Sequence, residues 1–275
     1  MNVLHKFAEE IEKHVRPATY PFAVRLLRPG EEVPEGAKRP KRDLGKCLSA
    51  CQGFSLARRY GMSIAMLKED MWCPEPVIGF GLAEPPQYFL EGYNRYPDGV
   101  ETLEAGANWA REFPRLEIVQ YVGVVAAPLS SVNFEPDVVV IYCNSAQLLR
   151  ILLAVAFKDG RDITSQLSGH AACVYTVVPA LKTGKCYVTI PCRGDRNRAG
   201  AQDDEIIFTV PRAKLDDLVL GFGKEGTGRV PSTPMLVSEY KLSPSYAKMA
   251  GLMGMKKSDG SEIQGFTKKE RLPHE

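Results

Sequence analysis

The segment Asp137–Cys143, which reads Asp-Val-Val-Val-Ile-Tyr-Cys, constrains the fold of this chain more than any other. A continuous apolar run rich in β-branched residues is typical of a strand that is covered on both faces. Asn144 or Ser145 can then cap a helix over 146–158, which would end before Gly160. The segment therefore predicts a sheet whose central strand leads into a helix packed on one face.

Strands and helices alternate along the rest of the chain. Predicted strands cover residues 22–27, 62–67, 116–126, 186–190 and 205–210, and predicted helices cover 1–15, 44–60, 170–178, 211–220 and 245–255. With 24 glycines and 20 prolines among 275 residues, loops must be abundant. We expect an α/β or α+β fold, in which a loop-rich mixed sheet carries helices on its faces.

Three parts are expected along the chain. Residues 1–20 would hold an amphipathic helix, 21–222 a single domain, and 223–275 a partly helical extension that ends in a polar tail over 256–275.

Charge and cysteine content exclude several classes of protein. The 35 Lys and Arg residues nearly balance 33 Asp and Glu, which argues against nucleic acid as the main partner. No apolar stretch is long enough to span a membrane, and the first helix does not resemble a signal peptide. Seven cysteines, an odd number in a long chain, favour a reducing compartment. We therefore expect a cytoplasmic protein without nucleic-acid or membrane partners, and a homo-oligomer remains open.

The cysteines differ in the chemistry that their surroundings allow. Cys143 and Cys186 lie in apolar runs and are expected to pack in the core. Cys73 and Cys192 are each flanked by proline in predicted loops, where a rigid backbone suits an iron–sulfur or zinc ligand. Together with Cys51 they form our proposed ligand set.

A fourth ligand could come from either of two cysteines. Cys47 lies one helical turn before Cys51, and Cys173 lies in a later helix. The chain contains no Cys-x-x-Cys pair, the usual mark of such metal sites, so spacing alone does not choose between them.

Two further features suggest chemistry. On the helix predicted over 170–178, His170 and Cys173 share a face, which would allow an imidazole to activate a thiol nucleophile; a cap or core role for His170 is the alternative. The segment 192–198, predicted to be a loop, carries three arginines. Arg193 and Arg196 could bind a carboxylate or phosphate with Asp195 orienting one of them, unless the loop is simply a solvated surface.

An ordered set of short motifs resembles a known family, the domain of unknown function 169. The resemblance covers roughly residues 21–221 and rests on these residues: Cys51-Gln52, Leu56 to Arg59, Cys73-Pro74, Gly79, Gly81, Pro128-Leu129, Pro136 to Ile141, Asn144, Gln147, Arg150, Gly194 to Arg196, Asp204-Glu205 and Pro211. The resemblance implies no established activity. It implies a group common in anaerobic archaea and bacteria, in which an oxygen-sensitive cluster or an exposed thiolate is tolerable. It also favours Cys51, Cys73 and Cys192 over Cys47, which lies outside the shared pattern.

The sequence thus supports three hypotheses. The first is a cytoplasmic enzyme in which Cys51, Cys73 and Cys192 hold an iron–sulfur cluster or zinc, while Arg193, Asp195 and Arg196 bind an anionic small molecule. The second is a non-catalytic protein that binds a small molecule or cofactor and whose cysteines are structural. The third is a cysteine-nucleophile enzyme that uses the pair His170 and Cys173.

Overall fold

The computed structural model describes residues 3–224, 226–228 and 243–255. The chain forms two compact units, residues 1–229 and 230–275. In the second unit the predicted helix over 245–255 is present as α11 (Pro244–Leu252), while the predicted polar tail lies outside the described residues. In the described part of the chain, no helix has the length and apolar character needed to cross a bilayer.

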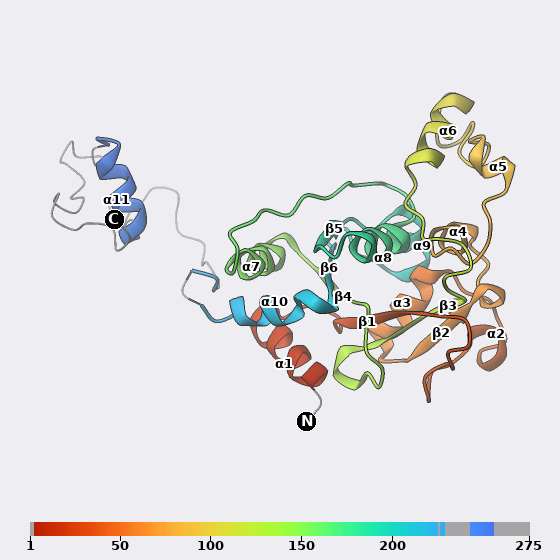
Figure 1. Cartoon of the computed structure of the whole chain (residues 1–275), viewed down its shortest axis with the longest axis horizontal. Helices are drawn as coiled ribbons and strands as arrows, with labels where there is room; N and C mark the ends of the chain where they lie inside the picture. The colour runs from red at the N-terminus through yellow and green to blue at the C-terminus, as the bar shows by residue number, and fades with distance from the viewer. Residues whose placement is uncertain (1–2, 225, 229–242, 256–275) are drawn as a thin grey trace. The chain divides into compact units, whose positions relative to one another are not determined.

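The first unit contains one six-stranded sheet (Figure 1). Its strands are β1 (Phe22–Leu27), β2 (Ile64–Leu67), β3 (Gly123–Pro128), β4 (Val138–Cys143), β5 (Tyr187–Thr189) and β6 (Ile206–Pro211). They lie in the order β2-β3-β1-β4-β6-β5, and all five strand pairings are antiparallel. The expected sheet with helices on its faces is confirmed, and its antiparallel pairing selects α+β from the two classes left open.

β4 is the central strand that the apolar run predicts. It pairs with β1 on one side and β6 on the other, and all six of its residues are buried. Side chains alternate between the faces of a strand, so Val138, Val140 and Tyr142 enter one core while Val139, Ile141 and Cys143 enter the other.

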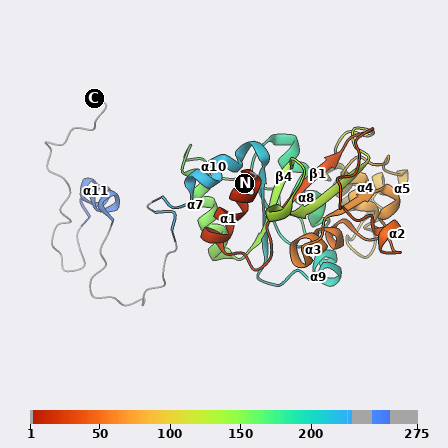
Figure 2. The ribbon, with the colours of Figure 1, turned by 90° about the horizontal axis from the view of Figure 1, so that it is seen from below.

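Each face of the sheet is covered by its own set of helices. One face packs against α1 (Val3–Val15), α7 (Ser145–Ala156) and α10 (Leu215–Gly221), which lie to the left of β4 in Figure 2. The other face packs against α3 (Ala50–Tyr60), α4 (Pro74–Gly79), α8 (Ala172–Thr183) and α9 (Arg193–Ala199). The remaining helices are α2 (Pro40–Asp43), α5 (Gln87–Leu90), α6 (Leu103–Glu112), η1 (Lys68–Asp70), η2 (Leu129–Ser131) and η3 (Arg212–Lys214). The predicted packing cysteines, Cys143 and Cys186, are buried in the core under α1, α7 and α10.

Two helices begin or end at residues other than those predicted. The helix predicted over 44–60 begins only at Ala50, because Ser49 and Gln52 form a capping box. The helix predicted to stop at Pro179 continues to Thr183, whose hydroxyl donates a hydrogen bond to the Pro179 carbonyl. A proline removes one backbone donor, and the burial of eight of the twelve residues of α8 outweighs that loss.

The segment 192–198 is also different from its predicted form. It was expected to be a loop, but residues 193–199 form α9, which Gly200 ends with a φ of 69°. In a helix, successive side chains point in different directions, so the three arginines of this segment need not face the same ligand.

Candidate functional site

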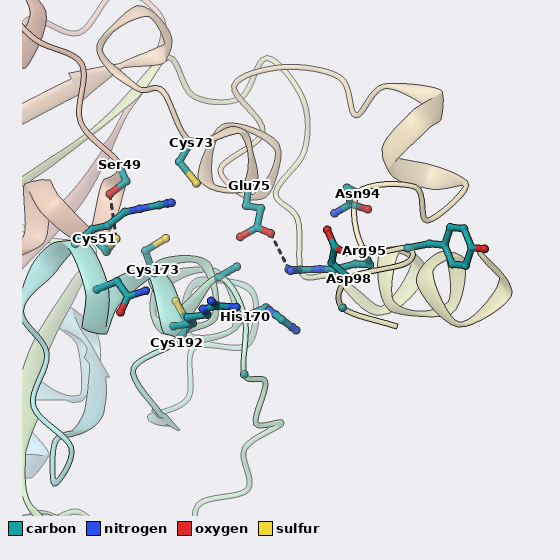
Figure 3. A pocket seen from close by; sticks show the side chains of 18 of the residues that line it. Ser49, Cys51, Cys73, Glu75, Asn94, Arg95, Asp98, His170, Cys173 and Cys192 are labelled. Carbon is teal, nitrogen blue, oxygen red and sulfur yellow. Dashed lines mark hydrogen bonds and ion pairs between the residues drawn. The ribbon is translucent and has the colours of Figure 1, made fainter. Parts of the chain in front are cut away.

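Four helices on one face of the sheet begin around a single pocket of about 620 Å³. Cys73 directly precedes α4 and Cys192 directly precedes α9, while Cys51 and Cys173 are the second residues of α3 and α8. All four cysteines line the pocket, and Figure 3 shows their sulfur atoms gathered on one side of it. The structure thus brings together the three predicted ligands and one of the two candidates for a fourth.

Cys47, the other candidate, does not line this pocket. Its thiol is partly exposed and donates a hydrogen bond to the Glu69 carbonyl at 3.4 Å. Of the two cysteines left open by the sequence, Cys173 is therefore the one placed beside Cys51, Cys73 and Cys192.

Burial keeps three of the four pocket thiols protonated. It raises the pKa of Cys51 to about 12, although a contact with the Ser49 hydroxyl at 3.0 Å opposes the shift. Burial likewise raises the pKa of Cys73 to about 11 and that of Cys173 well above its usual value, and the neighbouring thiols add to each effect. A thiol with so high a pKa is a poor nucleophile at neutral pH, but a metal displaces its proton on binding.

The four thiols lie on one side of the pocket (Figure 3) but do not form a site for a single metal ion. Within residues 3–224, 226–228 and 243–255, no three Cys, His, Asp or Glu side chains lie where they could hold one metal ion. In a cubane [4Fe–4S] cluster each of the four thiolates binds a different iron atom, so its ligands need not converge on one point.

Cationic side chains line other parts of the same pocket. Arg95 pairs with Glu75 at 2.7 Å, and its guanidinium lies 4.0 Å from the centroid of the Trp109 ring. Arg198 lies over the Trp72 ring at 4.6 Å, and the exposed Arg193 has no ion-pair partner among the described residues.

Two residues predicted to bind the anion lie elsewhere. Arg196 does not line the pocket, because it donates hydrogen bonds to the Gln202 carbonyl at 2.7 Å and to Asp203 at 3.1 Å. Asp195 is 1% exposed and accepts a hydrogen bond from the Tyr142 hydroxyl at 2.8 Å. Neither of these two side chains is directed at a ligand in the pocket, and Arg198 lines it instead.

The surroundings of Asp195 include a buried ion pair that the sequence did not reveal. Arg58 is 1% exposed and contacts both carboxylate oxygens of Glu205, at 2.7 and 3.1 Å. Its guanidinium also lies 3.7 Å from the centroid of the Tyr142 ring. These groups connect α3, β4 and α9 beneath the cysteines.

His170 and Cys173 both line the pocket but do not share a helix face, because α8 begins at Ala172. Ala171 adopts a left-handed φ of 48°, a strained conformation for a residue with a Cβ, and so turns the chain into α8. The His170 ring packs edge-on against Trp109, and burial together with Arg95 lowers its pKa. No hydrogen bond joins His170 to Cys173 within the described part of the chain.

Sequence reasoning missed much of the pocket wall. The missed residues are Ser49, Glu75, Tyr88, Tyr93, Asn94, Arg95, Tyr96, Asp98 and Asn197. The one signal that could have indicated them is the run Tyr93-Asn94-Arg95-Tyr96, in which polar and aromatic residues interrupt the helical pattern.

The fold and pocket define an α+β protein with a cysteine-lined site. The chain belongs to the family described as "DUF169: Uncharacterised ArCR, COG2043", whose model matches residues 10–221. It is also similar to the uncharacterized protein MJ0308 of Methanocaldococcus jannaschii, with 27% identity over 203 residues that cover 72% of this chain and 85% of the relative. No solved structure gives a significant match.

Proposed function

We propose that this protein is an enzyme that holds an iron–sulfur cluster on Cys51, Cys73, Cys173 and Cys192 and binds an anionic small molecule in the same pocket. The observation that carries the proposal is the gathering of four cysteines from four separate segments around one pocket. Four cysteine thiolates are the usual ligand set of a cubane cluster.

The setting of these cysteines differs from that of cysteines used for packing. Cys51, Cys173 and Cys192 belong to a buried apolar cluster, as Cys143 and Cys186 do, but they and Cys73 also line a pocket that holds arginine, asparagine and carboxylate side chains. The pocket also supplies positive charge to balance bound thiolates, from arginines and from the starts of four helices.

Arg193 and Arg198 would bind the anionic molecule. A guanidinium binds carboxylate or phosphate groups through paired hydrogen bonds, and Arg193 is free to do so. A ligand in this position would lie in the same pocket as the cluster.

Metal analysis of protein purified without oxygen tests the proposal. We expect iron and acid-labile sulfide in the wild type, with the visible absorption of a cluster, and loss of most of both in single serine variants of the four pocket cysteines. Cys143→Ser and Cys186→Ser are matched controls, because both residues are buried on the opposite face of the sheet and should retain iron. Zinc without sulfide would show that the cysteines hold a metal ion and no cluster. Protein that remains metal-free after reconstitution with iron and sulfide would refute the proposal.

The second hypothesis, a non-catalytic binding protein with structural cysteines, is favoured by one observation. No three ligand side chains converge on a single point among the described residues. Under that hypothesis an anionic ligand would still stabilise all four serine variants in a thermal-shift assay. The metal content of each variant would equal that of the wild type.

A further inference from the structure

Three tyrosines present their rings to the pocket away from the cysteines. Tyr88, Tyr93 and Tyr96 line it and are 61%, 39% and 42% exposed. The rings of Tyr88 and Tyr93 are stacked, with centroids 5.3 Å apart and planes at 21°. Within the described part of the chain, none of the three hydroxyl groups has a hydrogen-bond partner. These rings therefore form a solvated aromatic surface on a wall of a pocket.

The segment that carries the tyrosines is held in place. Gly92 and Gly106 lie in close backbone contact, which a Cβ on either residue would block, and this fixes the segment against α6. Arg95 adds a second anchor through its ion pair with Glu75 and its contact with the Trp109 ring. The tyrosines are thus presented on a fixed support, which lowers the entropic cost of binding.

A polar atom next to these rings lacks a partner. Asn94 lines the pocket, and its side-chain oxygen is buried without a hydrogen bond among the described residues. In Figure 3, Asn94 and Arg95 lie across the pocket from the cysteine sulfurs. A buried acceptor without a partner costs free energy, which a ligand N–H or O–H donor would recover.

We propose that the anionic ligand of this pocket carries a planar heteroaromatic ring, which stacks on the tyrosines and donates a hydrogen bond to Asn94, while its anionic group reaches Arg193 or Arg198. This assignment rests on the proposed function, because it specifies the molecule bound beside the cluster. Aromatic side chains stack on any planar ring, and the arginines supply recognition of phosphate or carboxylate. A pocket of about 620 Å³ lies in the range of small-molecule sites. The class described is that of a heteroaromatic phosphate or carboxylate such as a mononucleotide.

Calorimetric titration of protein purified without oxygen tests this assignment with four probes. Flavin mononucleotide and adenosine monophosphate carry both a ring and a phosphate, riboflavin carries the ring alone, and inorganic phosphate carries the anion alone. We expect at least one of the two mononucleotides to bind saturably, and to bind at least about tenfold more tightly than inorganic phosphate.

Variants then separate the two ends of the ligand. Replacing Tyr88 and Tyr93 by alanine should weaken mononucleotide binding about tenfold or more, while replacing both by phenylalanine should largely retain it. Replacing Arg193 and Arg198 by glutamine should weaken binding of the mononucleotide but not of riboflavin. Tyr60→Ala is the matched control, since Tyr60 is 71% exposed and does not line this pocket.

Iron and sulfide are measured in every sample, so that the two proposals can fail separately. Tyrosine-dependent mononucleotide binding by protein that holds no metal supports this assignment and refutes the cluster. A cluster in protein that binds neither mononucleotide, or binds one equally well after the alanine substitutions, refutes this assignment and leaves the cluster standing.

Discussion

The carboxyl group of Asp195 is buried with one oxygen bonded to the Tyr142 hydroxyl and the other without a partner in the described structure. Burial raises its pKa from the usual 3.8 to about 6, although the Tyr142 hydrogen bond and the charge of Arg58 act in the opposite direction. The folded protein therefore keeps a proton on Asp195 at pH values where the unfolded chain has lost it. We predict that Asp195→Asn stabilises the protein at neutral pH.

The size of the effect follows from the pKa difference. One pKa unit corresponds to about 1.36 kcal/mol, so a shift of this size corresponds to about 3 kcal/mol. The stabilising contribution of the protonated carboxyl is complete below about pH 4 and is lost as the pH rises through about 6. Asparagine is neutral at every pH and can still accept the Tyr142 hydrogen bond. The variant should therefore match the wild type near pH 4 and exceed it by up to about 3 kcal/mol at pH 7.5.

Urea unfolding of both proteins between pH 4 and 7.5, at constant ionic strength, measures this difference. Other buried acids with a raised pKa, such as Glu75 and Asp137, contribute equally to both proteins and cancel. Asp203→Asn is the control, because this side chain is fully exposed and its variant should show no such pH dependence. A stability difference that stays flat across the range, or a variant less stable than the wild type at pH 7.5, would refute the reasoning.

Three further predictions concern packing and thiol accessibility around the pocket. Arg58→Met removes the closer of the two arginines that pair with the buried Glu205, leaving Arg59 at 3.6 Å, and should lower the free energy of unfolding by about 3 kcal/mol in urea titrations, whereas an exposed pair would cost under about 1 kcal/mol. Gly79→Ala places a Cβ 2.5 Å from a Val174 methyl group between α4 and α8 and should cost about 1–3 kcal/mol, most of which Val174→Ala in the same chain should restore. In metal-free native protein, iodoacetamide should label Cys47 before Cys173, because Cys173 is buried and its pKa is raised. Peptide mass spectrometry measures the two labelling rates, and equal rates would contradict the burial of Cys173.

The sequence predicted the parts of the fold that depend on local pattern. The apolar run of β4 and the alternation of strands and helices were sufficient for a covered sheet. The ends of helices were harder, because a capping box at Ser49 and the burial of α8 decide them, and the second depends on the whole fold.

Three cysteines of the candidate site could be predicted from the sequence, but which arginines line it could not. Pro74 is the first residue of α4, and Pro191 lies directly before Cys192, the N-cap of α9. Both cysteines therefore lie where the chain enters a helix, and helices that cover the same face of a sheet can begin at the same place. The arginines could not be assigned, since each residue of a helix turns by about 100° and only the orientation of α9 decides that Arg198 lines the pocket and Arg196 does not. The pairing of Arg58 with Glu205, 147 residues apart, has no local signal.

The position of the four cysteines at helix starts links the fold to the proposed chemistry. A buried thiol is inert while it is protonated, and burial together with the neighbouring thiols keeps Cys51 and Cys173 in that state. A bound metal removes the proton and leaves a negative charge on sulfur, which the first N–H groups of a helix stabilise. Cys51 and Cys173 each lie in the first turn of a helix of 11 or 12 residues, where this effect is available. The same pocket would therefore disfavour free thiolates and favour metal-bound ones, which is the difference that selective cluster binding requires.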